Sequence, residues 1–203
     1  MLRRIALVAA VIGAFILASG ATFAFFSAST TQARSSFTAG TLTLTSKRDS
    51  GDTVPGPMFY ISSSDPVANN GIYPTGLWAP GDSHTRLLNV TNTGSLAGWL
   101  SSVQASEITS SSLKHQLNVE VLAPDPNDPA TYEMVANAPL DSFLAGPVSL
   151  AFSDGSKIPI AANGGAVDLE FKVTLNQSAG NAYQAETEVV TFAVNAVQMK
   201  NNP

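Results

Sequence analysis

Alternation of apolar and polar residues dominates the chain after its first segment. The clearest case runs from Val167 to Leu175, where apolar side chains occupy every second position, and a second case runs from Val190 to Ala196. Shorter cases lie at residues 41–45, 88–90, 99–105 and 117–121. Successive side chains of a strand point to opposite faces, so each segment is expected to bury one face and expose the other. The pattern predicts β-strands.

Turn-forming sequences separate these predicted strands. They are Ala79–Asp82, Asn92–Gly94, Pro124–Pro129, Asp154–Gly155 and Asn163–Gly165. No sustained period of 3.6 residues follows the first segment, so little helix is expected. The sequence therefore predicts an all-β fold, an antiparallel β-sandwich of the jelly-roll or immunoglobulin-like kind. One domain is expected over residues 36–203, with a proline-rich long loop at 49–80.

The first segment is typical of a signal peptide. Arg3 and Arg4 precede the uncharged run Ile5–Ala18, and Thr22 and Ala24 stand at positions −3 and −1 of a cleavage site before Phe25. We therefore expect residues 1–24 to be removed, which leaves no stable membrane span. Loss of the two arginines lowers Lys+Arg from 10 to 8 against 15 acidic residues, so the formal net charge changes from −5 to −7. An uncleaved anchor is the alternative, because residues 5–26 are long enough to cross a bilayer.

Composition narrows the function classes. The chain of 203 residues has no cysteine, which excludes disulfides, thiolate metal sites and a cysteine nucleophile. The acidic pI near 4.8 argues against a nucleic-acid partner, since such proteins present a basic surface to phosphates. Only 12% of residues are charged, about half the usual quarter, so Ser, Thr, Asn and Gln must supply a polar surface. Export without cysteine favours a Gram-positive cell surface or medium.

Few residues point to catalysis. The two histidines, His84 and His115, do not have zincin spacing, and no Gly-x-Ser-x-Gly elbow or phosphate-binding glycine loop occurs. We therefore predict no enzymatic activity and no cofactor, although a Ser–His–Asp triad could assemble in space. His84 is expected to be solvated at a strand start.

The proline-rich turn at residues 124–129 offers oxygen ligands to a hard cation. Asp125, Asn127 and Asp128 are the weak calcium candidates. Ala130 and Ala136 occupy the positions where a calcium-binding loop carries glycine and glutamate, so a proline-stiffened turn is the simpler interpretation.

The segment after the cleavage site, residues 25–35, is expected to pair as a strand. It contains no proline or glycine, and its weak alternation gives it little reason to close its own core. Such a segment can add to the sheet edge of another molecule. The predicted assembly strand comprises Phe25, Phe26, Ser27, Ala28, Ser29, Thr30, Thr31 and Gln32. The alternative is that the two phenylalanines pack on their own domain.

Four blocks, in order along most of the chain, are similar to one family of exported proteins. They are residues 22–27 around the cleavage site, Phe-Thr-Ala-Gly-Thr-Leu-Thr-Leu at 37–44, the Pro-Gly-Asp and Asn-Thr-Gly turns within 78–94, and residues 180–198. On these blocks the chain resembles the TasA/camelysin family. The block at 37–44 is the most specific, because many β-sandwich modules contain Pro-Gly-Asp.

The resemblance implies a jelly-roll sandwich secreted by a Gram-positive bacterium, with its signal peptide cut by a signal peptidase of the SipW type. For the best-known members it implies fibres of the extracellular biofilm matrix, in which the N-terminal segment of one subunit completes the sheet of the next. The partners implied are further copies of the chain and accessory matrix proteins. Residues 27–30 stand where the family commonly has an acidic stretch.

Two other functions stay open at this point. A monomeric adhesin or carbohydrate-binding sandwich would use the aromatic residues Tyr60, Tyr73 and Trp78 of the long loop, although Trp78 could equally pack into the core. A camelysin-like metalloprotease is the less favoured alternative, because the sequence lacks the zinc motif.

Overall fold

The computed structural model describes residues 39–48, 58–59 and 75–199. The predicted signal peptide, the predicted assembly strand and most of the predicted long loop lie outside these residues. All described helices and strands belong to one unit, Gly40–Pro203. Within the described part of the chain, no helix is both long enough and apolar enough to cross a bilayer.

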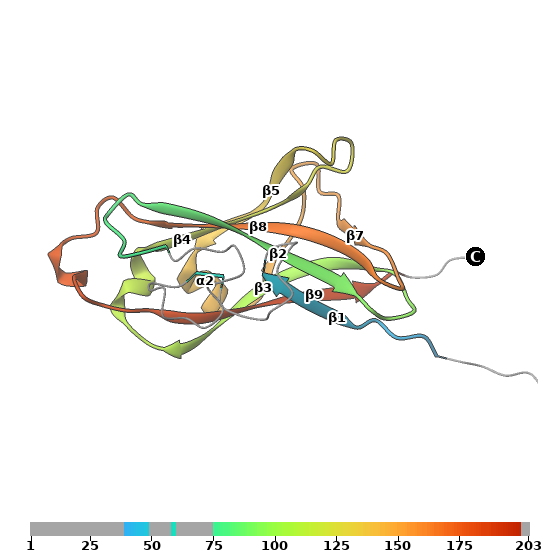
Figure 1. The fold of residues 1–203 in the computed structure, drawn as a ribbon, viewed down its shortest axis with the longest axis horizontal. Helices are drawn as coiled ribbons and strands as arrows, with labels where there is room; N and C mark the ends of the chain where they lie inside the picture. The colour runs from blue at the N-terminus through green and yellow to red at the C-terminus, as the bar shows by residue number, and fades with distance from the viewer. Residues whose placement is uncertain (1–38, 49–57, 60–74, 200–203) are drawn as a thin grey trace, which may run out of the picture. The chain divides into compact units, whose positions relative to one another are not determined.

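Five strands form sheet A, in the order β1-β2-β8-β4-β5 (Figure 1). All neighbouring strands in it are antiparallel. Their bounds are β1 (Leu44–Arg48), β2 (Ser83–Asn92), β8 (Gly165–Leu175), β4 (Leu117–Pro124) and β5 (Tyr132–Pro139). The two long predicted alternations thus lie in different sheets, since Val167–Leu175 falls in β8 of this sheet and Val190–Ala196 falls in the other.

The central strand of sheet B is β3 (Gly98–Thr109), with antiparallel partners on both sides. One partner, β9 (Val189–Gln198), follows β3 along its length. Two short strands, β6 (Val148–Ser149) and β7 (Ile158–Ile160), share the opposite edge. The helices are short: α2 (Leu140–Ala145) and the 3-10 turns η1 (Ser112–Gln116) and η2 (Asn181–Tyr183). The predicted all-β class with antiparallel sheets is confirmed, whereas the jelly-roll connectivity stays a prediction.

The core lies between the two sheets and follows the predicted alternation. Leu169 and Phe171 of β8 are fully buried, as are Leu100 and Val103 of β3. The residues between them face outward and are partly exposed. Burying one such side chain contributes about 1.5–3 kcal/mol, so this layer is the main source of stability.

The predicted turn at Ala79–Asp82 has the geometry that its sequence requires. Pro80 precedes Gly81, whose φ of +93° suits a residue without a Cβ. The Asp82 carboxylate accepts a hydrogen bond from the Ala79 amide at 2.6 Å, and the Gly81 amide donates to the Leu175 carbonyl at 2.9 Å. The turn therefore starts β2 in register with the end of β8.

Asn92, at the end of β2, joins two turns at one end of the sandwich. Its side chain is fully buried and donates to the carbonyls of Leu96 at 2.7 Å and Ala161 at 3.0 Å. Its Oδ1 accepts from the Gly94 amide at 2.9 Å. Every polar atom of this buried amide group has a partner, as a buried polar group requires. The β2–β3 and β7–β8 turns are thereby fixed to each other.

Candidate functional site

One side of the sandwich is closed by the chain itself. The Ala151 amide donates to the Val135 carbonyl of β5 at 3.1 Å, which connects the sheet A edge to the segment that follows β6 in sheet B. Helix α2 covers the neighbouring part with Leu140 and Phe143. Buried apolar residues of this side all have an exposed fraction of 5% or less: Val135, Leu140, Phe143, Leu150, Phe152, Ile158 and Ile160.

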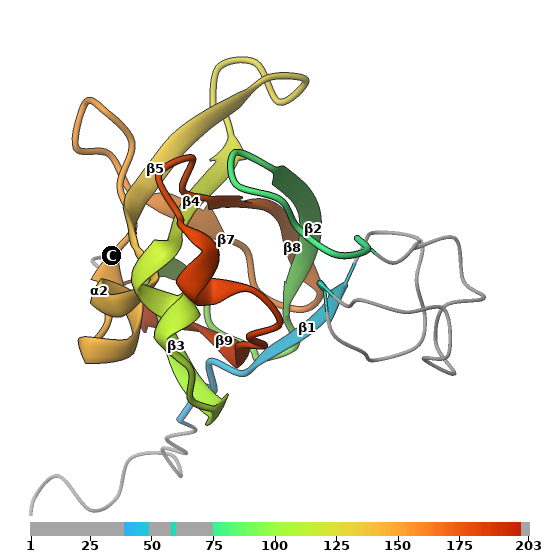
Figure 2. The ribbon, with the colours of Figure 1, turned by 90° about the vertical axis from the view of Figure 1, so that its left-hand side faces the viewer.

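On the opposite side, between β1 and β9, no helix or strand among the described residues covers the core, although Leu42 lies against Gly98 and Arg48 at the end of β1 is 2% exposed. There, β1 pairs only with β2, and β9 pairs only with β3, so the outer edge of each strand has no described strand partner. Figure 1 and Figure 2 both place these two strands next to each other. We call this region the open side. Unpaired edges are the parts of a sheet that accept an additional strand.

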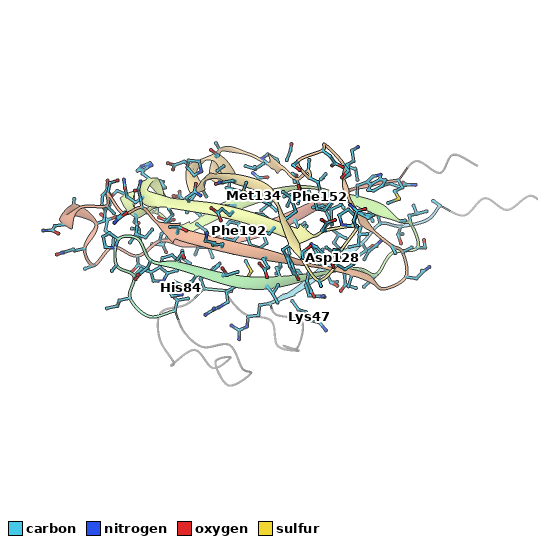
Figure 3. All side chains as sticks on the ribbon, turned by 90° about the horizontal axis from the view of Figure 1, so that it is seen from above. Lys47, His84, Asp128, Met134, Phe152 and Phe192 are labelled. Atoms are coloured by element: carbon cyan, nitrogen blue, oxygen red, sulfur yellow. The ribbon has the colours of Figure 1, made fainter. Side chains whose placement is uncertain are left out.

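The inward face of β9 is incompletely buried. Val190, Phe192, Val194 and Ala196 pack against the core, yet each stays partly exposed. The ring of Phe192 lies 5.2 Å from that of Phe171 and 6.4 Å from that of Phe143 in α2, so it reaches the centre of the sandwich. Figure 3 labels Phe192 together with Phe152, its fully covered counterpart on the closed side. Within the described ranges, the open side therefore combines strand edges that have no partner strand with apolar side chains that are partly exposed.

The chain approaches β1 by docking on the β2–β3 turn. The amides of Thr93 and Leu96 donate to the carbonyls of Thr43 at 2.8 Å and Thr41 at 2.9 Å. A side chain at Gly94 would clash with the backbone of Thr41 and Thr43, so glycine is required for this close approach. The predicted strand at 41–45 is therefore found three residues later, at 44–48.

The weak calcium candidates form a turn between β4 and β5. The carboxylate of Asp125 accepts from the Asn127 amide at 2.7 Å, and that of Asp128 accepts from the Ala130 amide at 3.2 Å. In the described ranges, no cluster of three or more His, Asp or Glu side chains has the geometry for a metal ion. These contacts agree with the turn interpretation, and Asp128 lies at the surface (Figure 3).

The two histidines lie in separate places. His84 lies at the start of β2, directly after the turn, and is partly exposed, with its ring 4.6 Å from that of Trp78. Trp78 also contacts Phe59 edge-on at 6.3 Å and donates to Thr75 at 3.0 Å, which makes it a packing residue. Tyr60 and Tyr73 lie outside the described residues. The aromatic platform expected for a glycan-binding long loop therefore stays a prediction.

His115 lies beside a shallow depression of about 410 Å³ on the outer face of sheet A. Its Nδ1 is 2.8 Å from Asp141 Oδ2, and both groups are exposed. Across the same depression, Lys172 is paired with Glu120 at 3.0 Å. Among the described residues, no hydrogen bond connects His115 to a serine hydroxyl. Each of these side chains thus has another one as its partner: His115 has Asp141, and Lys172 has Glu120.

A further ion pair joins the end of β3 to η1. Lys114 donates to the Glu107 carboxylate, and this contact lowers the pKa of Glu107 and raises that of Lys114. Both side chains lie at the surface, where such pairs contribute little. The two pKa shifts have opposite directions because each charge stabilises the other.

Comparison with known proteins adds no family. No protein-family model matches the chain, and no curated protein matches it. The resemblance to the TasA/camelysin family rests on the sequence blocks alone.

The open side was not foreseen, because the alternation in β9 is as regular as that in β8. Only the order of strands in space shows that one of them lies at an edge.

Proposed function

We propose that the mature chain is a secreted structural subunit that polymerises head to tail into fibres of an extracellular matrix. Residues 25–32 of one subunit would add as a strand to the open side of the next. The observation that supports this function is the partly exposed inward face of β9 beside the unpaired edges of β1 and β9. A signal peptidase of the SipW type would release the donor segment by cutting between Ala24 and Phe25.

Strand addition accounts for both features of the open side. Backbone hydrogen bonds along a free edge supply affinity, and alternate side chains of the added strand enter apolar sites. Phe25 and Phe26 are adjacent and so point to opposite faces of an added strand, which leaves one of the two rings to meet Val190, Phe192 and Val194. Burial of that phenylalanine would contribute about 1.5–3 kcal/mol to assembly.

The proposal is tested by deleting residues 25–32 from the mature chain. We expect the parent to form fibres in electron micrographs and the deletion variant to remain monomeric in sedimentation velocity. Ser29→Ala, a change in the same segment that removes no apolar group, is the matched control and should leave fibres intact. Fibres of normal length from the deletion variant would rule the mechanism out.

The deletion variant also distinguishes donation between subunits from packing within one subunit. It retains its own open side, so it can accept a donor strand but cannot provide one. Added to the parent in small amounts, it should therefore end growing fibres and shorten them. If Phe25 and Phe26 only pack on their own domain, the variant would leave fibre length unchanged.

A further inference from the structure

The outer face of sheet B differs in chemistry from the rest of the surface. Cross-strand pairs place its side chains in rows, because directly paired residues of antiparallel strands point to the same face. The inward residues of β3, such as Leu100 and Val103, are buried, so their neighbours face outward. We call the outward set the neutral face. It comprises Trp99, Ser102, Gln104, Ser106, Ser149, Pro159, Thr191, Ala193, Asn195 and Val197.

No residue of the neutral face carries a charge. The outer face of sheet A, in contrast, carries Asp168, Glu170, Lys172 and Glu120, with Lys172 and Glu120 joined at 3.0 Å. A charged ligand would find no counter-charge on the neutral face, whereas an uncharged ligand can approach it without desolvating ions. The charge distribution therefore favours a neutral partner.

One end of the neutral face is apolar. Trp99 pairs with Pro159 on one side and Val197 on the other, which makes a row across three strands. Val197 is 47% exposed and Trp99 is partly exposed. Among the described residues, Trp99 makes no ring contact and is not packed against the core, unlike Trp78. A tryptophan with its surface turned outward offers a large, rigid, apolar contact area and an N–H donor.

The remainder of the neutral face is a ladder of hydroxyl and amide groups. The Asn195 amide donates to the Ser102 hydroxyl at 3.2 Å, which orients both side chains. The side chains of Gln104, Ser106 and Thr191 have no hydrogen-bond partner within the described part of the chain. They are consequently able to bond the hydroxyl groups of a ligand.

The size of the neutral face distinguishes between two possible ligands, a second copy of this chain and a single extended polymer chain. From Trp99 to Ser106 it extends about 24 Å along β3, and its width of about 14 Å beside β6 and β7 falls to two strands beyond Val103, so its area is at most about 340 Å². A stable protein dimer needs about 800 Å² from each partner, so a second copy of this chain would be held weakly here. A single extended polymer chain needs only a narrow track.

We propose that the neutral face binds an uncharged polysaccharide lying along β3. Trp99, with Pro159 and Val197, would contact the apolar face of one sugar ring, while Gln104, Ser106 and Thr191 would hydrogen-bond hydroxyls of its neighbours. This function goes beyond fibre formation and does not depend on it, because β9 presents its other face to the sandwich interior.

The test is co-sedimentation of the mature chain with insoluble neutral glucans, namely cellulose and curdlan particles. We expect binding that Trp99→Ala weakens about tenfold or more, with Trp99→Tyr restoring much of it. Ala193→Glu puts a charge at an exposed position of the same face and should also weaken binding without disturbing the core. Met134→Ala, which removes an exposed apolar side chain from sheet A, is the matched control and should bind as the parent does.

Three results would overturn the proposal. The first is no sedimentation of the parent with either neutral glucan, and the second is binding to immobilised polygalacturonate alone. The third is unchanged binding after Ala193→Glu in a protein whose thermal unfolding matches the parent. Fibre formation is scored separately by electron microscopy, so failure of glucan binding is distinguishable from failure of strand donation. Self-association that Ala193→Glu abolishes, without glucan binding, would assign the neutral face to a second copy.

Discussion

The closed and open sides of this sandwich use the same kind of strand but reach different degrees of burial. On the closed side, the chain supplies α2 and the segment around β6 and β7, and residues such as Phe152 are 5% exposed. On the open side, β9 presents an equally regular apolar face that stays partly exposed. The difference teaches that incomplete burial, more than apolar composition, distinguishes the side where we propose that another chain is accepted.

The largest expected effect comes from removing one aromatic ring from each side. Phe152→Ala should lower the free energy of unfolding of the monomer by about 3–5 kcal/mol, because it leaves a cavity in a fully covered core. Phe192→Ala should cost only about 1.5–2.5 kcal/mol, since its ring is already partly exposed. Denaturant unfolding of both variants in the deletion background lacking residues 25–32 measures the two values without interference from assembly.

One outcome of these unfolding measurements would contradict the difference between the two sides. Equal losses of stability in the two variants would mean that the open side is as well covered as the closed side. Phe192 would then have no spare surface for a donor strand, and the acceptor edge would have to be sought elsewhere.

A smaller effect on stability is expected from a substitution of Asn92, at the end of the sandwich where the β2–β3 and β7–β8 turns meet. Asn92→Ala should lower stability by about 3 kcal/mol, because it leaves the Leu96 and Ala161 carbonyls and the Gly94 amide without a partner. Asn89→Ala is the matched control in the same strand. Its amide donates to Asp168 at 2.7 Å on the outer face, so a loss below about 1 kcal/mol is expected.

Thermal or denaturant unfolding of the two asparagine variants checks this prediction. Similar small losses from both would show that the buried network of Asn92 is not needed to fix the turns. The docking of residues 41–43 on the β2–β3 turn would then need another explanation.

Much of the fold could be predicted from local sequence. The long alternations become β8 and β9, and the Pro-Gly-Asp turn starts β2 as expected. The strand β5 was missed, because a bulge opposite Val121 and Leu122 and two small alanines obscure its alternation. Helix α2 has only six residues, too few to show a helical period, and β6 and β7 are equally short.

The candidate site could be predicted only in part. The sequence predicts a donor segment at residues 25–32, whose placement the described residues do not include. The acceptor could not be foreseen, since strand order is set by contacts between residues far apart in the chain: Trp99 pairs with Val197, for example. The neutral face of sheet B could not be foreseen for the same reason, because only strand pairing brings its scattered Ser, Gln and Asn residues together.

The central claim, that the open side accepts a strand from another subunit, is tested most directly by hydrogen–deuterium exchange of monomer and fibre. Amides of β1 and β9 should exchange more slowly in fibres, because their outer edges become paired, while those of β5 stay nearly unchanged. Unchanged exchange in β1 and β9 on assembly, with new protection elsewhere, would contradict the account.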